Sequence, residues 1–163
     1  MSHDDLDFVS GMLGDPETMR FYPKPLTREE SAGWIDRRLA QYENHGHSLW
    51  LVELTETGEP VGHVGLVPQL IDGVLEPEIG YLVARAHWRK GIASEAAAGV
   101  RDFAFSSLNR SHVISLVRLV NAPSQAVARS IGMSVVRSTT FANLEHLVFL
   151  VRRPPVTAID EKS

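Results

Sequence analysis

The sequence contains no cysteine, and this absence excludes several functional classes at once. Without cysteine there is no disulfide framework, no thiolate nucleophile and no zinc site built from thiolates. Basic residues are also too few to create a general positive field, because 16 Lys and Arg stand against 20 Asp and Glu, a formal net charge of -4. We therefore expect no nucleic-acid partner, and any anion-binding site must be local.

Long apolar runs are missing as well. No stretch approaches the length of a membrane span, and residues 1–10 lack the cationic start and apolar stretch of a signal peptide. We therefore expect a cytoplasmic protein without a membrane partner. The seven histidines show no H-E-x-x-H or similar ligand spacing, so no metal site is expected.

The size and composition are those of one globular domain. The chain has 163 residues, of which 44% are hydrophobic and 22% are charged. This length supports one hydrophobic core but is too short for two domains of typical size. We assign residues 1–153 to a single domain and residues 154–163 to a polar C-terminal tail.

Hydrophobic spacing and turn residues predict alternating helices and strands. Helices are expected over residues 4–13, from Thr27 to a stop at 44–46, over 92–108, and over 124–131 with Gly132 as a left-handed cap. Strands are expected over residues 48–55, 60–70, 76–83, 113–120, 134–141 and 144–152. The first three strands form an antiparallel meander, the helical crossover sets the fourth parallel to the third, and the last two form a hairpin. The fold class is therefore α/β (α+β), a mixed and mostly antiparallel sheet with flanking helices.

Residues 88–94 predict an anion cradle where a strand meets a helix. Gly91 and Ala93 are small residues at the helix start, so backbone N–H groups without helical partners can point at a phosphate. Arg89 and Lys90 add positive charge at the same place. Neither the nucleoside triphosphate loop nor the dinucleotide fingerprint fits, because the glycines that they require are absent. The alternative is an ordinary turn with two solvated cations.

The cradle resembles the pyrophosphate loop of the GNAT superfamily of acyl-CoA-dependent N-acyltransferases. That loop begins with Gln or Arg and continues x-x-G-x and Gly or Ala; Gly91 and Ala93 match it, whereas Trp88 departs from it. Residues 88–96 are similar to the W-G-K-G-Y/I-A-S/T-E-A signature of the RimJ/RimL-like branch, with Arg89 in the usual Gly place. Further similar blocks follow in the family order, so the resemblance spans roughly residues 15–152: Val61–Leu66, Glu78–Tyr81, Asn121–Ser124 and Gly132–Met133.

The resemblance implies how a cofactor is held. In this family two central parallel strands splay apart, and the pantetheine arm of acetyl-CoA, the acyl donor, enters the gap. The implied cofactor-binding residues are Leu82, Val83, Trp88, Arg89, Lys90, Gly91, Ile92, Ala93, Ser94 and Asn121. The family normally opens with an edge strand, for which residues 2–5 are a poor candidate. Its loss would expose a sheet edge and allow a homodimer.

Amine acylation requires a base, and Glu78 is the predicted one. Strand alternation places Glu78, Gly80 and Leu82 on one face, from which the carboxylate can take a proton through water if that face lines the cleft. Glu76 lies on the same face and is the reserve candidate. The alternative is that Glu78 is a solvated charge on an open sheet face.

Ser124 is the predicted partner of the leaving thiolate. Many relatives use a tyrosine seven positions after the Asn, but Ala128 stands there and excludes that acid. The resemblance implies that Ser124 faces the sulfur and that Asn121 both caps a helix and contacts the pantetheine. The alternative is an ordinary helix start, in which Asn121 or Ser124 only satisfies free amides.

The predicted function is transfer of an acetyl group from acetyl-CoA to a primary amine, of a protein N-terminus or a small molecule, by direct attack in a ternary complex. The rivals are a non-catalytic acyl-CoA sensor and an interaction domain with a decayed cofactor site. The sequence does not identify the acceptor, although a strongly acidic cleft would favour a cationic one. Tyr22, Trp34 and Trp50 fit either an acceptor pocket or the core, and Arg37 and Arg38 are predicted to face solvent.

Overall fold

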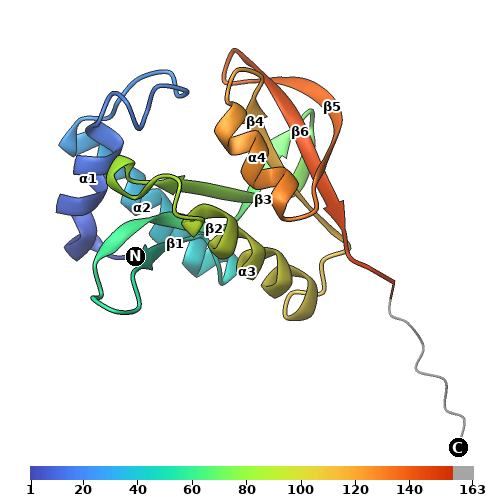
Figure 1. The fold of residues 1–163 in the computed structure, drawn as a ribbon, viewed down its shortest axis with the longest axis horizontal. Coiled ribbons are helices and arrows are strands. Elements are labelled where there is room, and N and C mark those ends of the chain that lie inside the picture. Colours follow the sequence, from blue (N-terminus) through green and yellow to red (C-terminus); the bar gives the residue numbers. More distant parts are fainter. Residues whose placement is uncertain (156–163) are drawn as a thin grey trace, which may run out of the picture.

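A six-stranded mixed sheet organises the chain, with the strand order β1-β2-β3-β4-β6-β5 (Figure 1). The computed structural model describes residues 1–155. Neighbouring strands are antiparallel except β3 and β4, which are parallel, so the predicted meander, crossover and final hairpin are confirmed. The strands are β1 (Leu49–Glu53), β2 (Pro60–Ile71), β3 (Val74–Val83), β4 (His112–Arg118), β5 (Ser134–Phe141) and β6 (Leu144–Arg152).

Helices cover both faces of the sheet. Apolar side chains of α1 and α2 pack around Val9 and Ile35 against one face, which includes Leu82 of β3. Side chains of α3 and α4 pack with Ile79 and Phe149 on the opposite face and form the main core. The helices are α1 (Leu6–Gly14), α2 (Arg28–His45), α3 (Ile92–Ser106) and α4 (Ala122–Ser130), with short 3₁₀ turns at His3–Asp5 and Arg85–His87. No helix within residues 1–155 is long and apolar enough to cross a membrane.

The N-terminus and several element ends differ from the expectations. Residues 3–5 form a 3₁₀ turn instead of the start of α1, and within residues 1–155 no strand precedes α1, so β1 is an edge of the sheet. Strand β4 ends at Arg118, and the apolar residues Leu119 and Val120 are exposed, because the chain turns there into α4. Of the predicted tail, residues 156–163 lie outside the described residues.

The tight turns behave as their residue types predict. Asp72 and Gly73 join β2 to β3 with φ angles of 50° and 81°, the positive pair of a type I′ hairpin turn. Gly132 follows α4 with φ 86°, its N–H donates to Arg129 O, and the next N–H donates to Ala128 O. This is a Schellman ending, so the predicted left-handed glycine is confirmed.

The parallel pair β3–β4 is joined over a short stretch only. A single Cα pair, Glu78 with Ile114, is in register. Beside it, Ser115 Oγ donates to Ile79 O at 2.8 Å, and Leu116 N–H donates to Glu78 Oε1 at 3.3 Å. The predicted splay is therefore present, and the carboxylate of Glu78 lies where the two strands begin to separate.

Candidate active site

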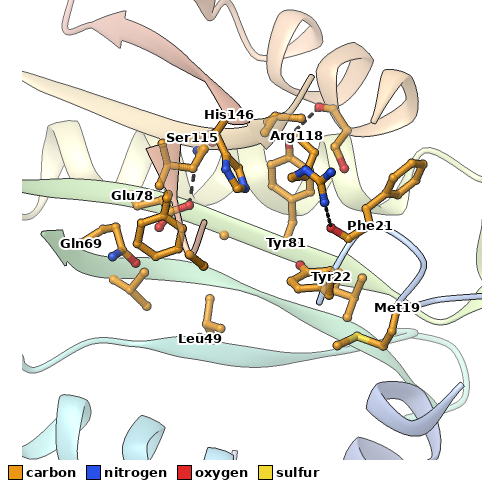
Figure 2. A pocket seen from close by; sticks show the side chains of 18 of the residues that line it. Met19, Phe21, Tyr22, Leu49, Gln69, Glu78, Tyr81, Ser115, Arg118 and His146 are labelled. Atoms are coloured by element: carbon orange, nitrogen blue, oxygen red, sulfur yellow. Dashed lines mark hydrogen bonds between the residues drawn. The ribbon is translucent and has the colours of Figure 1, made fainter. Parts of the chain in front are cut away.

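A cavity of about 570 Å³ lies beside the splayed strands (Figure 2). Its walls come from β3 and β4, from the segment 19–26 before α2, from α2 itself and from the β5–β6 hairpin. A second cavity of about 120 Å³ runs beside the end of β3 and the start of α4. Tyr81, Leu82, Asn121 and Ser124 line both cavities, so the two are parts of one cleft.

Glu78 lines the larger cavity, as the sequence predicts for a base. Burial raises the pKa of Glu78 to about 7, while the Leu116 N–H and the positive charge of Arg38 act in the opposite direction. A carboxyl with this pKa changes protonation near neutral pH, as a general base requires. Glu76, the reserve candidate, lines neither cavity, and its Oε2 contacts His112 Nε2 at 2.6 Å.

The backbone at the end of β3 faces the gap. Ala84 N–H donates to Val61 O of β2 at 2.8 Å. Because backbone groups alternate between the two edges of a strand, those of Tyr81 and Val83 point away from β2 and into the splay. The carbonyl of Val83 is occupied, since Trp88 Nε1 donates to it at 2.7 Å.

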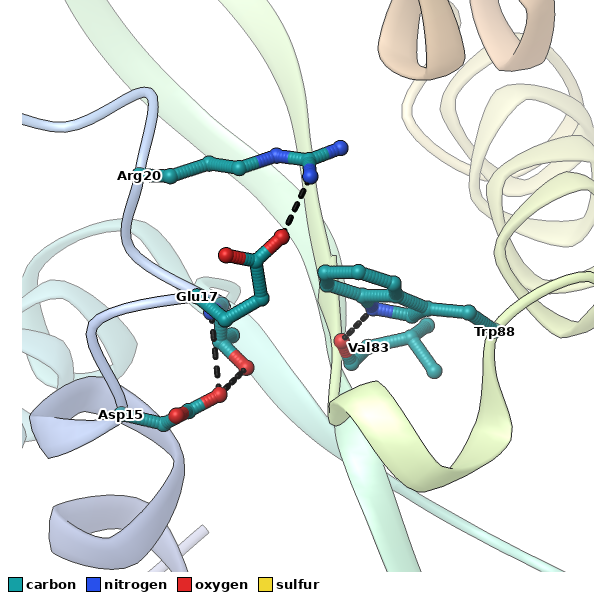
Figure 3. A network of polar contacts seen from close by, with 6 residues as sticks. Asp15, Glu17, Arg20, Val83 and Trp88 are labelled. Atoms are coloured by element: carbon teal, nitrogen blue, oxygen red, sulfur yellow. Dashed lines mark hydrogen bonds and ion pairs between the residues drawn. The ribbon is translucent and has the colours of Figure 1, made fainter.

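Trp88 therefore binds the last residue of β3, at the end of the splayed strand (Figure 3). Its ring also supports the segment before α2, because the guanidinium of Arg20 lies 5.4 Å from the ring centroid and pairs with Glu17. Asp15 holds the start of that segment by accepting bonds from Thr18 N and Oγ1 at 3.0 and 2.6 Å. The position where the family usually has Gln or Arg thus holds together the strand end and the covering segment.

The predicted cradle is open at the start of α3. Gly91 has φ 79°, no side chain caps the helix, and nothing lies within 4 Å of the place that a Cβ would take. Arg89 and Lys90 are exposed beside it. Arg89 itself has φ 62°, a left-handed conformation that Gly adopts with less strain than Arg. Free helical N–H groups, open space and two cations fit a pyrophosphate group.

The other loop residues lie around this opening. Ala93 lines the smaller cavity beside Trp88. Ser94 Oγ accepts a hydrogen bond from Ser130 Oγ at 3.0 Å, which ties the first turn of α3 to the end of α4. Ile92 is partly buried at the first helical position.

The start of α4 brings together the predicted thiolate partner and its neighbours. Asn121 Oδ1 accepts from Ser124 N–H at 3.1 Å, so Asn121 is the helix cap. Ser124 O accepts from the Tyr81 hydroxyl at 2.6 Å, whereas no protein partner for Ser124 Oγ is found within residues 1–155. Ala128 is fully buried in the main core. The serine hydroxyl is therefore free for a ligand in the cleft.

Sequence reasoning missed two contacts that join residues far apart in the chain. Tyr81 reaches α4 across 43 residues of sequence, and Arg118 Nη1 donates to Phe21 O at 3.1 Å across 97 residues. Together they link β3 to α4 and β4 to the segment before α2, on both sides of the cleft (Figure 2). A tyrosine preceded by the Glu78-Ile79-Gly80 block was the available signal for the first contact.

The aromatic and basic side chains outside the cradle separate into two groups. Tyr22 and Trp34 line the larger cavity, whereas Trp50 packs edge-on against Phe103, with ring centroids 5.6 Å apart, on the α3 face. Arg37 and Arg38 both line the larger cavity. The solvent-facing prediction is wrong for Arg38, which is half-buried because its guanidinium lies 5.2 Å from the Trp34 ring centroid.

Two buried imidazole rings, those of His63 and His146, also line the larger cavity. His63 of β2 lines the larger cavity, with its ring centroid 4.9 Å from that of Trp34. Burial lowers the pKa of His63 to about 3, and the charge of Arg38 acts in the same direction, so the ring is neutral. No group of three His, Asp or Glu side chains within residues 1–155 is arranged to hold a metal ion.

Comparisons with known proteins agree with this geometry. The chain is 34% identical over 122 residues to the YkkB protein of Bacillus subtilis, a match that covers 75% of this chain and 71% of YkkB. It superimposes on an acetyltransferase from Agrobacterium tumefaciens with a TM-score of 0.82 and 28% identity, over 94% of this chain and 88% of that one.

An aminoglycoside acetyltransferase AAC(6')-Ib in complex with coenzyme A has a TM-score of 0.79 and 16% identity, over 94% of this chain and 92% of that one, and so shares the fold. A family model, described as an acetyltransferase (GNAT) domain, matches residues 1–134. Splayed strands, an uncapped helix start and this match lead to one conclusion: the chain belongs to the GNAT family of acetyltransferase domains.

Proposed function

We propose that this protein transfers an acetyl group from acetyl-CoA to a primary amine, by direct attack in a ternary complex. The observation that carries the proposal is Glu78, a carboxyl at the fork of β3 and β4 whose pKa is raised to about 7 by burial in the cleft. A base that titrates near neutral pH can take a proton from an attacking ammonium or amine, directly or through one water.

The cofactor would occupy the α3 side of the cleft. The residues proposed to hold its pyrophosphate are Arg89, Lys90 and the free N–H groups from Gly91 to Ser94, with Trp88 and Ala93 lining the adjoining channel. Leu82, Val83 and Asn121 are proposed to contact the pantetheine, since they line the smaller cavity between the strand end and α4. Acetyl-CoA supplies an acetyl group that is activated as a thioester.

The chain's own groups then handle the charges of the reaction. A nitrogen–carbon bond forms, the carbon–sulfur bond breaks, and Glu78 takes the proton that the amine loses. The backbone N–H of Val83 faces the gap and is the proposed donor to the carbonyl oxygen, a role worth about 3 kcal/mol in other enzymes. Ser124 Oγ is the proposed hydrogen-bond donor to the leaving sulfur.

Three finer assignments belong to the same proposal. We infer a RimJ/RimL-like member of the family from residues 88–96, with Arg89 in the usual Gly place. A primary amine of a protein N-terminus or a small molecule is the acceptor, without nucleic acid or membrane. A cytoplasmic location, and a homodimer through an exposed sheet edge, complete the proposal.

A non-catalytic acyl-CoA sensor is the second candidate. Ala128 favours it, because it stands where many relatives have the tyrosine acid and its methyl group, buried in the core, cannot donate a proton. Turnover separates the two candidates, since a sensor binds acetyl-CoA without releasing free thiol in the presence of any amine.

The test is calorimetric titration of the wild type and of Gly91→Glu with acetyl-CoA, desulfo-CoA and ATP. We expect both CoA ligands to bind the wild type and ATP to bind weakly or not at all. Gly91→Glu places bulk and negative charge in the cradle and should raise the acetyl-CoA Kd at least tenfold, on the order of 1.4 kcal/mol.

Gly99→Glu is the matched control. Gly99 is exposed on the same helix with nothing within 4 Å of an added Cβ, so it adds the same charge outside the cleft. It should bind acetyl-CoA like the wild type. Absence of CoA binding by the wild type, or ATP binding of equal strength, would refute the cofactor assignment.

A further inference from the structure

We propose that the acceptor amine carries a carboxylate, and that Arg38 recognises this carboxylate while Glu78 receives the amine. This inference rests on the proposed function and names the acceptor class of the same site. It starts from the charges that line the larger cavity. Among residues 1–155, Glu78 is the only acidic side chain in this lining, and the Lys and Arg side chains are Lys24, Arg37, Arg38 and Arg118. The cavity is therefore positive in a chain whose net charge is -4.

The four cations differ in how they are already engaged. Lys24 pairs with Glu30, and Arg118 donates to the carbonyl of Phe21. Arg38, in contrast, has no ion pair and no hydrogen bond to any of residues 1–155, and the same is true of Arg37 at the exposed rim. Arg118 and Arg38 are both half-buried and both lack a protein counter-ion within residues 1–155, but only Arg38 also lacks a hydrogen bond to those residues.

The guanidinium of Arg38 is positioned as a planar receptor. Its Cζ lies over the Trp34 ring, 5.2 Å from the centroid, and its Nε is buried without a partner among residues 1–155. Its two terminal nitrogens remain for a ligand in the cavity. A guanidinium that is fixed by stacking can bind a carboxylate through two parallel hydrogen bonds.

Burial makes a carboxylate partner favourable. Burial and the neighbouring charge of Arg37 lower the pKa of Arg38, which means that its positive charge is poorly solvated. Glu78 acts on this pKa in the opposite direction but forms no ion pair with Arg38 within residues 1–155. An incoming carboxylate would supply the missing counter-charge, whereas a second ammonium group would be repelled.

The two groups together match a zwitterion. An amino acid has a carboxylate and an ammonium close together, and the cavity offers Arg38 to one and Glu78 to the other. The remaining lining is mainly apolar and includes Phe21, Leu49 and Leu144. We therefore expect an amino acid with an apolar side chain, and not a polyamine or an aminoglycoside, which carry several ammonium groups.

The experiment measures thiol release from acetyl-CoA with matched acceptors. L-Leucine and L-phenylalanine carry the carboxylate, their amides keep the amine without it, and 3-methylbutylamine and 2-phenylethylamine lack the group altogether. For the wild type we expect kcat/KM to be at least tenfold higher for each amino acid than for its decarboxylated amine, after correction for the fraction of free amine.

The Arg38→Met variant should abolish this preference. The ratio of kcat/KM between the carboxylate and decarboxylated acceptors should fall about 10-fold to 100-fold, the usual worth of a charged hydrogen-bonded pair. Arg38→Lys keeps the charge but loses the planar fork, so its ratio should be intermediate. Arg28→Met is the matched control, because Arg28 is exposed on the same helix, pairs with Asp7 and lines neither cavity; its ratio should not change.

The outcomes are separable. An equal ratio in the wild type and Arg38→Met, or a wild-type preference for spermidine or decarboxylated amines, would overturn the inference and leave the proposed function standing. No thiol release with any amine, despite acetyl-CoA binding, would refute the proposed function itself and the inference with it.

One further pair of acceptors identifies the source of the carboxylate. Peptides that begin with Asp or with Asn differ only in a side-chain carboxylate. If the Asp peptide is used better than free leucine, the carboxylate belongs to an N-terminal acidic residue; the reverse order assigns it to a free amino acid. We expect free leucine to be used better; better use of the Asp peptide, lost in Arg38→Met, would keep carboxylate recognition by Arg38 but overturn the apolar amino acid as the acceptor.

Discussion

The α3 side and the α2 side of the cleft both carry positive charge, but the two sides are built differently. At the start of α3, Gly91 leaves the helix without a side-chain cap, so backbone N–H groups face outward beside the exposed Arg89. Helix α2 begins with a closed capping box between Thr27 and Glu30, and it lines the cleft with side chains from further along the helix, which are Trp34, Arg37 and Arg38.

This difference indicates how each side would recognise its ligand and how each would respond to substitution. Backbone donors and exposed cations recognise phosphate whatever is attached to it, and substitution of a side chain leaves most of them in place. On the α2 side, in contrast, the charges proposed to bind the acceptor are those of two single side chains, the half-buried Arg38 and Glu78, so one substitution removes each of them. We therefore expect variants on the α3 side to change cofactor affinity, and variants on the α2 face, which includes Glu78, to change turnover and acceptor choice.

The largest expected effect is that of Glu78→Gln. The amide still offers an oxygen to the Leu116 N–H but cannot accept a proton, so kcat should fall by about 10²–10⁴-fold. The acetyl-CoA Kd should stay within about twofold of the wild type, since the loss lies on the acceptor side. Steady-state thiol release and calorimetry measure the two quantities. A parallel loss of affinity would break the comparison, because one residue would then serve both sides.

The pH dependence gives the next effect. The pKa of Glu78 is raised to about 7 by burial, so the wild-type kcat/KM, expressed per free amine, should rise about tenfold per pH unit below pH 7. This acid limb should be absent from Glu78→Gln, whose residual rate follows only the acceptor amine. Acetyl-CoA affinity should show no matching change between pH 6 and pH 8. A wild-type profile without this limb would mean that Glu78 is not the base.

Glu78 should also make the free energy of unfolding depend on pH, but in the opposite direction to the activity: low pH should favour the folded state. A carboxyl whose pKa is higher in the folded state than its ordinary value of 4.5 holds its proton more tightly when folded. The free energy of unfolding should therefore fall as pH rises from about 4.5 to about 7, by about 3 kcal/mol at most. Urea unfolding at pH 5 and pH 8 should show a smaller fall in Glu78→Gln than in the wild type.

Arg89→Gly should make the protein more stable but weaken its binding of acetyl-CoA, and both effects should be moderate. The left-handed φ of 62° costs a non-glycine residue about 1 kcal/mol, so the variant should be more stable by about that amount. Loss of the cation should raise the acetyl-CoA Kd about twofold to fivefold. Asn143→Gly, at φ 60° in the β5–β6 turn, is the control and should leave the Kd unchanged. Tighter binding by Arg89→Gly would show that the residue is kept for another reason.

The local parts of the fold could be predicted because short-range rules decide them. Asp72, Gly73 and Gly132 have positive φ, which their residue types favour. These residue types therefore predicted the β2–β3 hairpin and the end of α4. The open start of α3 could also be predicted, since no capping side chain precedes Ile92. The left-handed conformation of Arg89 could have been predicted as well, because Arg89 occupies a place where the resembling branch has Gly.

The acceptor side could not be predicted in the same way. Arg38 lies in the cavity because α2 crosses the sheet at one particular position and because Trp34 fills the space beneath it. The contacts of Tyr81 with Ser124 and of Arg118 with Phe21 depend on the splay and on tertiary packing, which hydrophobic periodicity does not encode. The side chains proposed to contact the acceptor could therefore be identified only from the structure.

The smallest expected effect is that of Thr27→Ala, which tests whether the α2 start is purely structural. Thr27 Oγ1 accepts from Glu30 N–H at 3.2 Å, and Glu30 Oε2 accepts from Thr27 N–H at 2.8 Å. Removing this cap should lower the free energy of unfolding by about 1 kcal/mol, measured by urea denaturation. Acetyl-CoA affinity should not change, because the capped amides of α2, unlike the free ones of α3, face no ligand. Weaker acetyl-CoA binding by Thr27→Ala would mean that the two helix starts are coupled through the segment before α2, which rests on Trp88 through Arg20.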